Sequence, residues 1–77
     1  MKKNLEIFVP EKLRAGVFSN TAKVNASPRE VVVDFALVEP IEPPKGVLVS
    51  RVILTPLHAM ELRDSLNKVL ARYQSNL

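Results

Sequence analysis

The chain lacks cysteine and tryptophan, and it contains only two glycines and one histidine among its 77 residues. Without cysteine it forms no disulfide and offers no thiolate to a metal. Disulfides and cysteine-bound metal ions, which often stabilise very small domains, are therefore excluded. A lone histidine makes a poor metal site, because zinc needs three or four ligands. With only Gly16 and Gly46, a glycine-rich phosphate-binding loop is excluded too. We therefore expect no cofactor, no metal and no nucleotide hydrolysis.

Long hydrophobic runs are also absent. Nothing in the sequence approaches the roughly 18 uninterrupted apolar residues that a membrane-spanning helix requires. Residues 1–6 lead directly to an acidic residue instead of the apolar core of a signal peptide. From these two absences we predict a cytoplasmic protein without a membrane partner.

What the chain does have is the composition of a folded domain. Hydrophobic residues make up 47% of the sequence and charged residues 25%, close to the average of soluble globular domains. Residues 1–77 are enough for a single domain, but at this size only roughly 60% of the unfolded surface becomes buried on folding. With disulfides and metals excluded, association between copies is the remaining way to stabilise so small a core.

The positive charge is modest and dispersed. The formal net charge is +3, and the basic residues are spread along the whole chain, which is more typical of ordinary solvation than of a nucleic-acid footprint. A sheet that binds single strands normally exposes aromatic side chains beside basic ones, whereas we expect Phe18 and Phe35 to lie in the core. Nucleic-acid binding is therefore the weaker alternative, supported by the net charge and by Arg63, Lys68 and Arg72.

Four segments rich in β-branched and aromatic residues predict strands. They are residues 5–9, 17–25, 30–38 and 47–54. In the first, Leu5, Ile7 and Val9 share one face and Pro10 ends the segment. Pro28 predicts a tight turn between the second and third segments, which should therefore pair antiparallel. The third and fourth segments carry apolar residues on both faces.

The remaining sequence predicts a stiff loop and a helix. Residues 40–46 contain three prolines, which remove backbone donors and exclude regular structure. Thr55 and Pro56 are a strong helix start, because threonine caps free amides and proline suits the first helical position. From Leu57 onward, apolar residues recur at helical spacing. The sequence thus predicts an amphipathic C-terminal helix.

This order of elements predicts an α+β fold, in which an antiparallel four-stranded sheet (a β-meander) is followed by one C-terminal helix packed on the sheet. Four strands spaced by about 4.8 Å form a sheet wider than a helix of about 10 Å diameter. Part of the apolar surface, including Val32, Ala36 and Val38, therefore needs another cover. Symmetric homodimers are the commonest soluble assemblies, which favours a second copy. The alternative is that the proline loop or the N-terminal strand folds over this surface.

Three polar residues are candidates for a site. Asp34 and Arg51 each interrupt an otherwise apolar strand, so we expect a cross-strand ion pair. The alternative is that Arg51 binds an anion at the helix start. His58 falls in the first helical turn, where packing or capping is favoured over catalysis or a metal site shared between subunits. The serines lack a nucleophile-elbow context.

Several of these segments resemble a known family. The matching pieces are FSN at 18–20, NASPRE at 25–30, DF at 34–35, RVILTPLHA at 51–59 and RY at 72–73. They are similar to the domain-of-unknown-function 3467 family of short prokaryotic proteins, over roughly residues 17–74. The resemblance supports the strands and the helix and implies little about function. Phe18 stands where such proteins are expected to carry tyrosine, which argues against a role for a hydroxyl group there.

The resemblance directs attention to eight residues that serve either as fold determinants or as a site. They are Asn20, Ser27, Pro28, Asp34, Phe35, Arg51, Pro56 and His58. From these we select Asn20, Asp34, Arg51 and His58 as ligand or interface residues. The predicted function is a non-catalytic homo-oligomeric protein-interaction module, with a second copy or an unidentified protein as partner. An enzyme would need a pocket that joins His58, Asp34 and Arg51.

Overall fold

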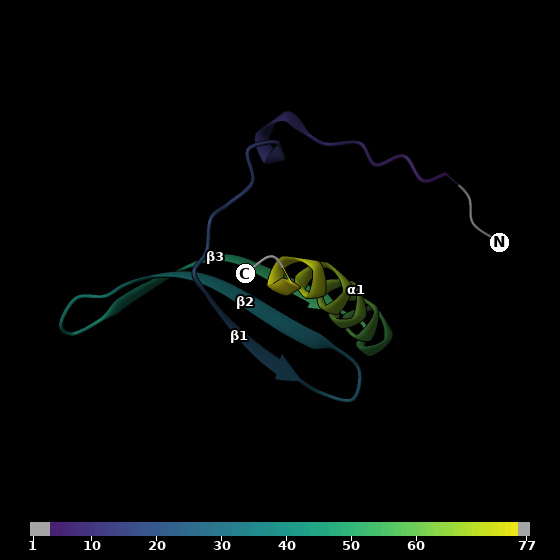
Figure 1. Ribbon diagram of the computed structural model, residues 1–77. Helices are drawn as coiled ribbons and strands as arrows, with labels where there is room; N and C mark the ends of the chain where they lie inside the picture. Colours follow the sequence, from purple (N-terminus) through teal and green to yellow (C-terminus); the bar gives the residue numbers. More distant parts are fainter. Residues whose placement is uncertain (1–3, 76–77) are drawn as a thin grey trace.

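The computed structural model describes residues 4–75 and shows a three-stranded antiparallel sheet followed by one long helix (Figure 1). In chain order the elements are η1 (Glu11–Leu13), β1 (Thr21–Ala26), β2 (Val31–Glu39), β3 (Lys45–Leu54) and α1 (Pro56–Ser75). The strand order is β1-β2-β3, as in a meander. The α+β class is therefore confirmed. Within residues 4–75, no helix is both long and apolar enough to cross a membrane.

The prediction of four strands is wrong. Residues 4–10, which we call the arm, are irregular in the described chain and extend away from the sheet (Figure 1). Their alternating apolar pattern indicates strand tendency, but a strand also needs a neighbour to pair with. The arm has none within the described chain, and the Ile7 side chain is 74% exposed. Phe18, expected in the core, is 75% exposed for the same reason, since residues 17–20 precede β1.

The sheet register contains one irregularity. Asp34 of β2 lies opposite Arg51 of β3, but a bulge between Phe35 and Ala36 then places Ala36 opposite Leu48. Strict alternation along residues 47–54 would put Leu48 on the same face as Val52. The extra residue of the bulge moves Leu48 to the other face, because each added residue reverses the side-chain direction. The proline-rich loop is confirmed, although β3 already begins at Lys45.

The two faces of the sheet differ in what covers them. One face, which we call the groove face, is apolar and lies toward α1; it carries Ala22, Val24, Val31, Val33, Phe35, Val52 and Leu54. The other, the ion-pair face, carries Lys23, Asp34 and Arg51 beside Val32 and Ile53. The helix packs on the sheet through β3, and β1 lies at the opposite edge (Figure 1). Leu54 is the one buried residue of the described chain, at 8% exposure.

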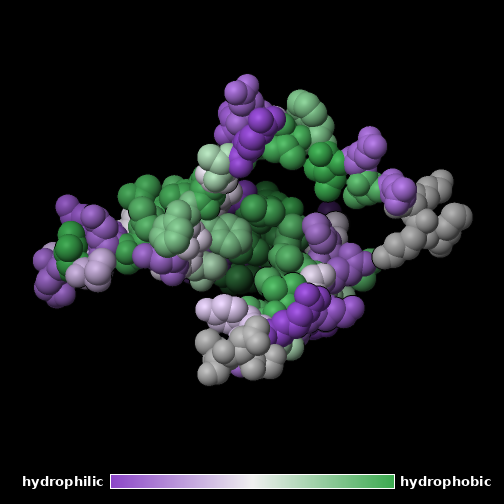
Figure 2. Space-filling model, turned by 45° about the horizontal axis from the view of Figure 1, so that its top comes forward, coloured by the Kyte–Doolittle hydropathy of each residue, from purple (hydrophilic) through white to green (hydrophobic). Residues whose placement is uncertain are grey.

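The chain by itself is open. It exposes 7457 Å² of surface, whereas a compact protein of 8.6 kDa exposes about 4,700 Å². Its radius of gyration is 15.7 Å, against about 11.5 Å for a compact chain of this length. Figure 2 shows hydrophobic residues at the surface of the body and along the N-terminal part of the chain, with open space between them. The single chain therefore does not enclose a core of its own.

Candidate functional site

Asp34 and Arg51 form the cross-strand ion pair expected from the sequence. The register of β2 and β3 sets the two residues opposite each other. Arg51 Nε donates a hydrogen bond to Asp34 Oδ1 at 2.6 Å, and Nη2 donates to Oδ2 at 3.0 Å. This two-bond geometry matches the planar guanidinium to the carboxylate and fixes both side chains on the ion-pair face. Arg51 is thereby engaged within the sheet, and its alternative role at the helix start has no support.

The charge environment keeps Asp34 ionised. Hydrogen bonding to Arg51 lowers the pKa of Asp34 below its usual value, and the nearby charges of Arg51 and Lys23 act in the same direction. Desolvation opposes this shift and is outweighed. Lys23 lies opposite Asp34 on β1, so the three strands carry charges of alternating sign in one row. This row stabilises the sheet register and does not resemble an acid–base site.

Asn20 continues the sheet beyond the start of β1. Its side-chain Nδ2 donates a hydrogen bond to the carbonyl of Val38 at 3.0 Å, and its Oδ1 accepts one from the Val38 amide at 2.9 Å. Its backbone amide donates to the carbonyl of Ala36. The side-chain amide thus replaces a backbone neighbour for Val38, beyond the Thr21–Ala36 pair at which the pairing of β1 with β2 ends. Asn20 is placed as a fold determinant.

His58 contributes its backbone to the start of α1. Its amide donates a hydrogen bond to Thr55 Oγ1 at 3.1 Å, which confirms Thr55 as the helix cap. The imidazole side chain is exposed. His58 lies just beyond Leu54, which pairs with Val31 at one end of the sheet, whereas Asn20 lies at the other end. The structure brings Asp34 and Arg51 together but not these two residues. Residues 4–75 contain no cluster of metal-ligating side chains.

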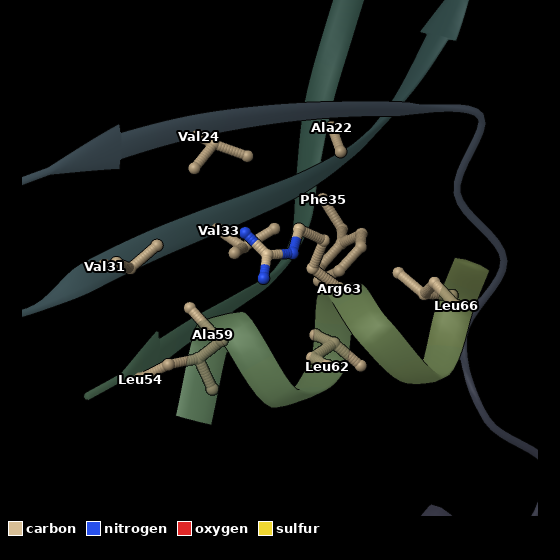
Figure 3. A pocket seen from close by; sticks show the side chains of 10 residues that line it. All are labelled: Ala22, Val24, Val31, Val33, Phe35, Leu54, Ala59, Leu62, Arg63 and Leu66. Atoms are coloured by element: carbon tan, nitrogen blue, oxygen red, sulfur yellow. The ribbon is translucent and has the colours of Figure 1, made fainter. Parts of the chain in front are cut away.

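A groove between the sheet and α1 is the feature that the sequence did not reveal. We call it the sheet–helix groove; its volume is about 310 Å³ (Figure 3). It is lined by Ala22, Val24, Val31, Val33, Phe35, Leu54, Ala59, Leu62, Arg63 and Leu66. All of these are apolar except Arg63, whose Nε donates to Asp64 Oδ1 at 3.1 Å. The alternation of residues in β2 and the helical spacing in α1 indicated two apolar faces. Neither pattern, however, indicated where α1 crosses the sheet and forms the groove.

The family model described as "Protein of unknown function (DUF3467)" matches residues 1–77, which is the whole chain. The chain belongs to this family. The resemblance seen over residues 17–74 is therefore confirmed, and it extends to the arm. Searches of curated proteins and of solved structures found no match.

Membership of this family assigns no activity, so the chemistry must come from the geometry. The sheet–helix groove presents aliphatic and aromatic carbon and one cationic side chain, which suits the binding of apolar side chains. Beside it, the outer edge of β1 is unpaired in the described sheet. Unpaired strand edges are templates for pairing with another chain. Together they form a surface suited to protein contact.

Proposed function

We propose that the chain is a non-catalytic homo-oligomeric interaction module in which the subunits complete each other's cores. The observation that carries this proposal is the exposed area, which exceeds that of a compact protein of the same mass by about 2,800 Å². If each subunit of a dimer buried that excess, the total of about 5,500 Å² would fall at the upper end of obligate dimer interfaces. Most of the protein's stability would then come from association.

The distribution of apolar surface supports the same proposal. Val24 on the groove face is about three-fifths exposed, and Leu66 on α1, which lines the same groove, is half exposed. Isolated exposed apolar residues are ordinary, but a contiguous patch over two elements marks an interaction surface. A second copy is the favoured occupant because a twofold axis buries the same patch on both subunits. A cytoplasmic setting is part of the proposal, since a chain without cysteine needs no oxidising compartment.

The test is the solution mass of the full chain, measured by light scattering during size exclusion over a dilution series. The proposal expects at least twice the subunit mass of 8.6 kDa at micromolar concentration. Leu66→Asp places a charge in the sheet–helix groove and should shift the protein toward monomer. Asn67→Asp adds the same charge at the neighbouring helix position and should leave the mass unchanged. A wild-type monomer across the series would overturn the proposal.

Nucleic-acid binding remains the less supported alternative. It rests on the net charge of +3, yet Arg51 and Arg63 are already hydrogen-bonded to Asp34 and Asp64. Binding that rests on phosphate contacts must weaken steeply between low and moderate salt. Retention of DNA or RNA with this salt dependence would favour the alternative over the interaction module.

A further inference from the structure

We propose that the arm of one subunit pairs with the free edge of β1 in a second copy, as an added fourth strand. This inference rests on the proposed self-association and names the segment and the edge that carry it. In strand addition, main-chain hydrogen bonds give affinity and alternate side chains enter pockets of the host. The edge of β1 and the sheet–helix groove beside it provide both parts.

The arm has the properties of a strand without a neighbour. Leu5, Ile7 and Val9 alternate with Glu6 and Phe8, as in a strand with one apolar face. Leu5 is 80% exposed, and no backbone hydrogen bond joins the arm to the sheet within residues 4–75. An extended apolar segment of this kind gains burial and hydrogen bonds when a strand edge pairs with it.

The turn after the arm directs it away from its own sheet. The amides of Leu13, Arg14 and Gly16 donate to the carbonyls of Pro10, Glu11 and Leu13, at 2.9 to 3.1 Å. Gly16 has a φ of 75°, in the left-handed region that favours glycine. These local bonds close the connection between the arm and β1 and send the arm outward (Figure 1). Because the arm lies away from its own sheet in this arrangement, the inference assigns it to the sheet of a second copy.

Charge sets the register of the added strand. With Glu6 opposite Lys23 of the second copy, the row across four strands becomes Glu6, Lys23, Asp34 and Arg51, which alternates in sign throughout. Lys23 has no ion pair within 4 Å in the described part of the chain, so Glu6 supplies its missing partner. Opposite charges facing each other across strands stabilise a sheet.

The same register fills the groove. When the arm runs antiparallel to β1, Leu5 lies beside Val24 and Ile7 beside Ala22, on the groove face. Ala22 leaves room for the larger Ile7 side chain. The edge of β3 is less suitable, because α1 follows it directly and packs on it, and Arg51 there already binds both oxygens of Asp34. Reciprocal exchange of two arms gives a closed twofold dimer.

A charge-reversal experiment tests this pairing. Glu6→Lys and Lys23→Glu subunits, prepared separately, each form homodimers with like charges facing. Mixed together, they form heterodimers in which both arm contacts again join opposite charges. Native mass spectrometry of the mixture should show heterodimers well above the statistical fraction. A statistical distribution would overturn the inference, because an arm folded on its own sheet gives no preference between subunits.

Cysteine cross-linking gives an independent result, helped by the absence of natural cysteine. Ile7→Cys subunits mixed with Ala22→Cys subunits should form a disulfide-linked dimer on mild oxidation. Phe8→Cys in place of Ile7→Cys is the matched control, because its side chain points to the opposite face and should link at least about tenfold more slowly. An oligomer that fails to link Ile7→Cys to Ala22→Cys refutes the arm exchange and leaves the proposed function standing. A monomeric mass refutes both.

Discussion

The Asp34–Arg51 pair shows how single residues set the sheet register. Because pairing lowers the pKa of Asp34 in the folded protein, the pair stabilises the fold above the ordinary carboxylate range and loses this effect as the pH falls through the lowered pKa. Asp34→Asn removes the ionised acceptor. We expect a lower urea midpoint for this variant at pH 7, and a difference from wild type that shrinks below about pH 4. Circular dichroism at a series of pH values measures both.

Asp64 provides the matched control for this prediction. It also accepts a hydrogen bond from an arginine, but Arg63 is its immediate neighbour on an exposed helix surface. Exposed pairs of this kind contribute little to stability. Asp64→Asn should therefore leave the urea midpoint unchanged at every pH. Equal losses in the two variants would mean that the cross-strand pair has no special role.

The first turn of α1 is capped by one hydroxyl group, that of Thr55. Thr55 Oγ1 accepts a hydrogen bond from the His58 amide, and the Thr55 carbonyl accepts one from Ala59. Thr55→Ala leaves the first of these amides unsatisfied and should lower the free energy of unfolding by about 1 kcal/mol. Thr55→Ser keeps the hydroxyl and should retain most of the stability in the same urea titration. A Thr55→Ala protein as stable as wild type would show that the cap is not required.

The elements that could be predicted are those with local causes. Thr55 and Pro56 predict the helix start, and the turn at Pro28 predicts the β1–β2 hairpin, because both effects act within a few residues. The arm was assigned to the sheet because alternation measures strand tendency and not the presence of a neighbour. The bulge at Phe35 was missed for a related reason, since an extra residue on β3 shows only when two strands are aligned.

The candidate site also combines features that the sequence could predict with features that it could not. The Asp34–Arg51 pair was predictable, because two charges in adjacent apolar strands require partners. The sheet–helix groove was not, since it depends on where α1 crosses the sheet and on how little of β1 it covers. Asn20 was selected through family resemblance, and only the structure shows that its amide bridges to Val38. The placement of α1 on the sheet and the contact of Asn20 with Val38 are thus the parts that a single sequence does not supply.

The whole molecule exposes a large apolar surface, and the proposed self-association would couple its folding to association. For a dimer that unfolds to separate chains, raising the protein concentration favours the folded state. A tenfold increase contributes about 1.4 kcal/mol, which for a dimer of this size raises the melting temperature by about 4 °C.

Calorimetry of the full chain over two decades of concentration measures this shift. Asn67→Asp should show the same dependence as wild type, because its side chain lies outside the sheet–helix groove. Leu66→Asp should melt at a lower temperature, since the charge weakens the proposed association between subunits. A melting temperature independent of concentration in the wild type would mean that the single chain closes its own core, with the arm and α1 packed differently from the open arrangement in Figure 1.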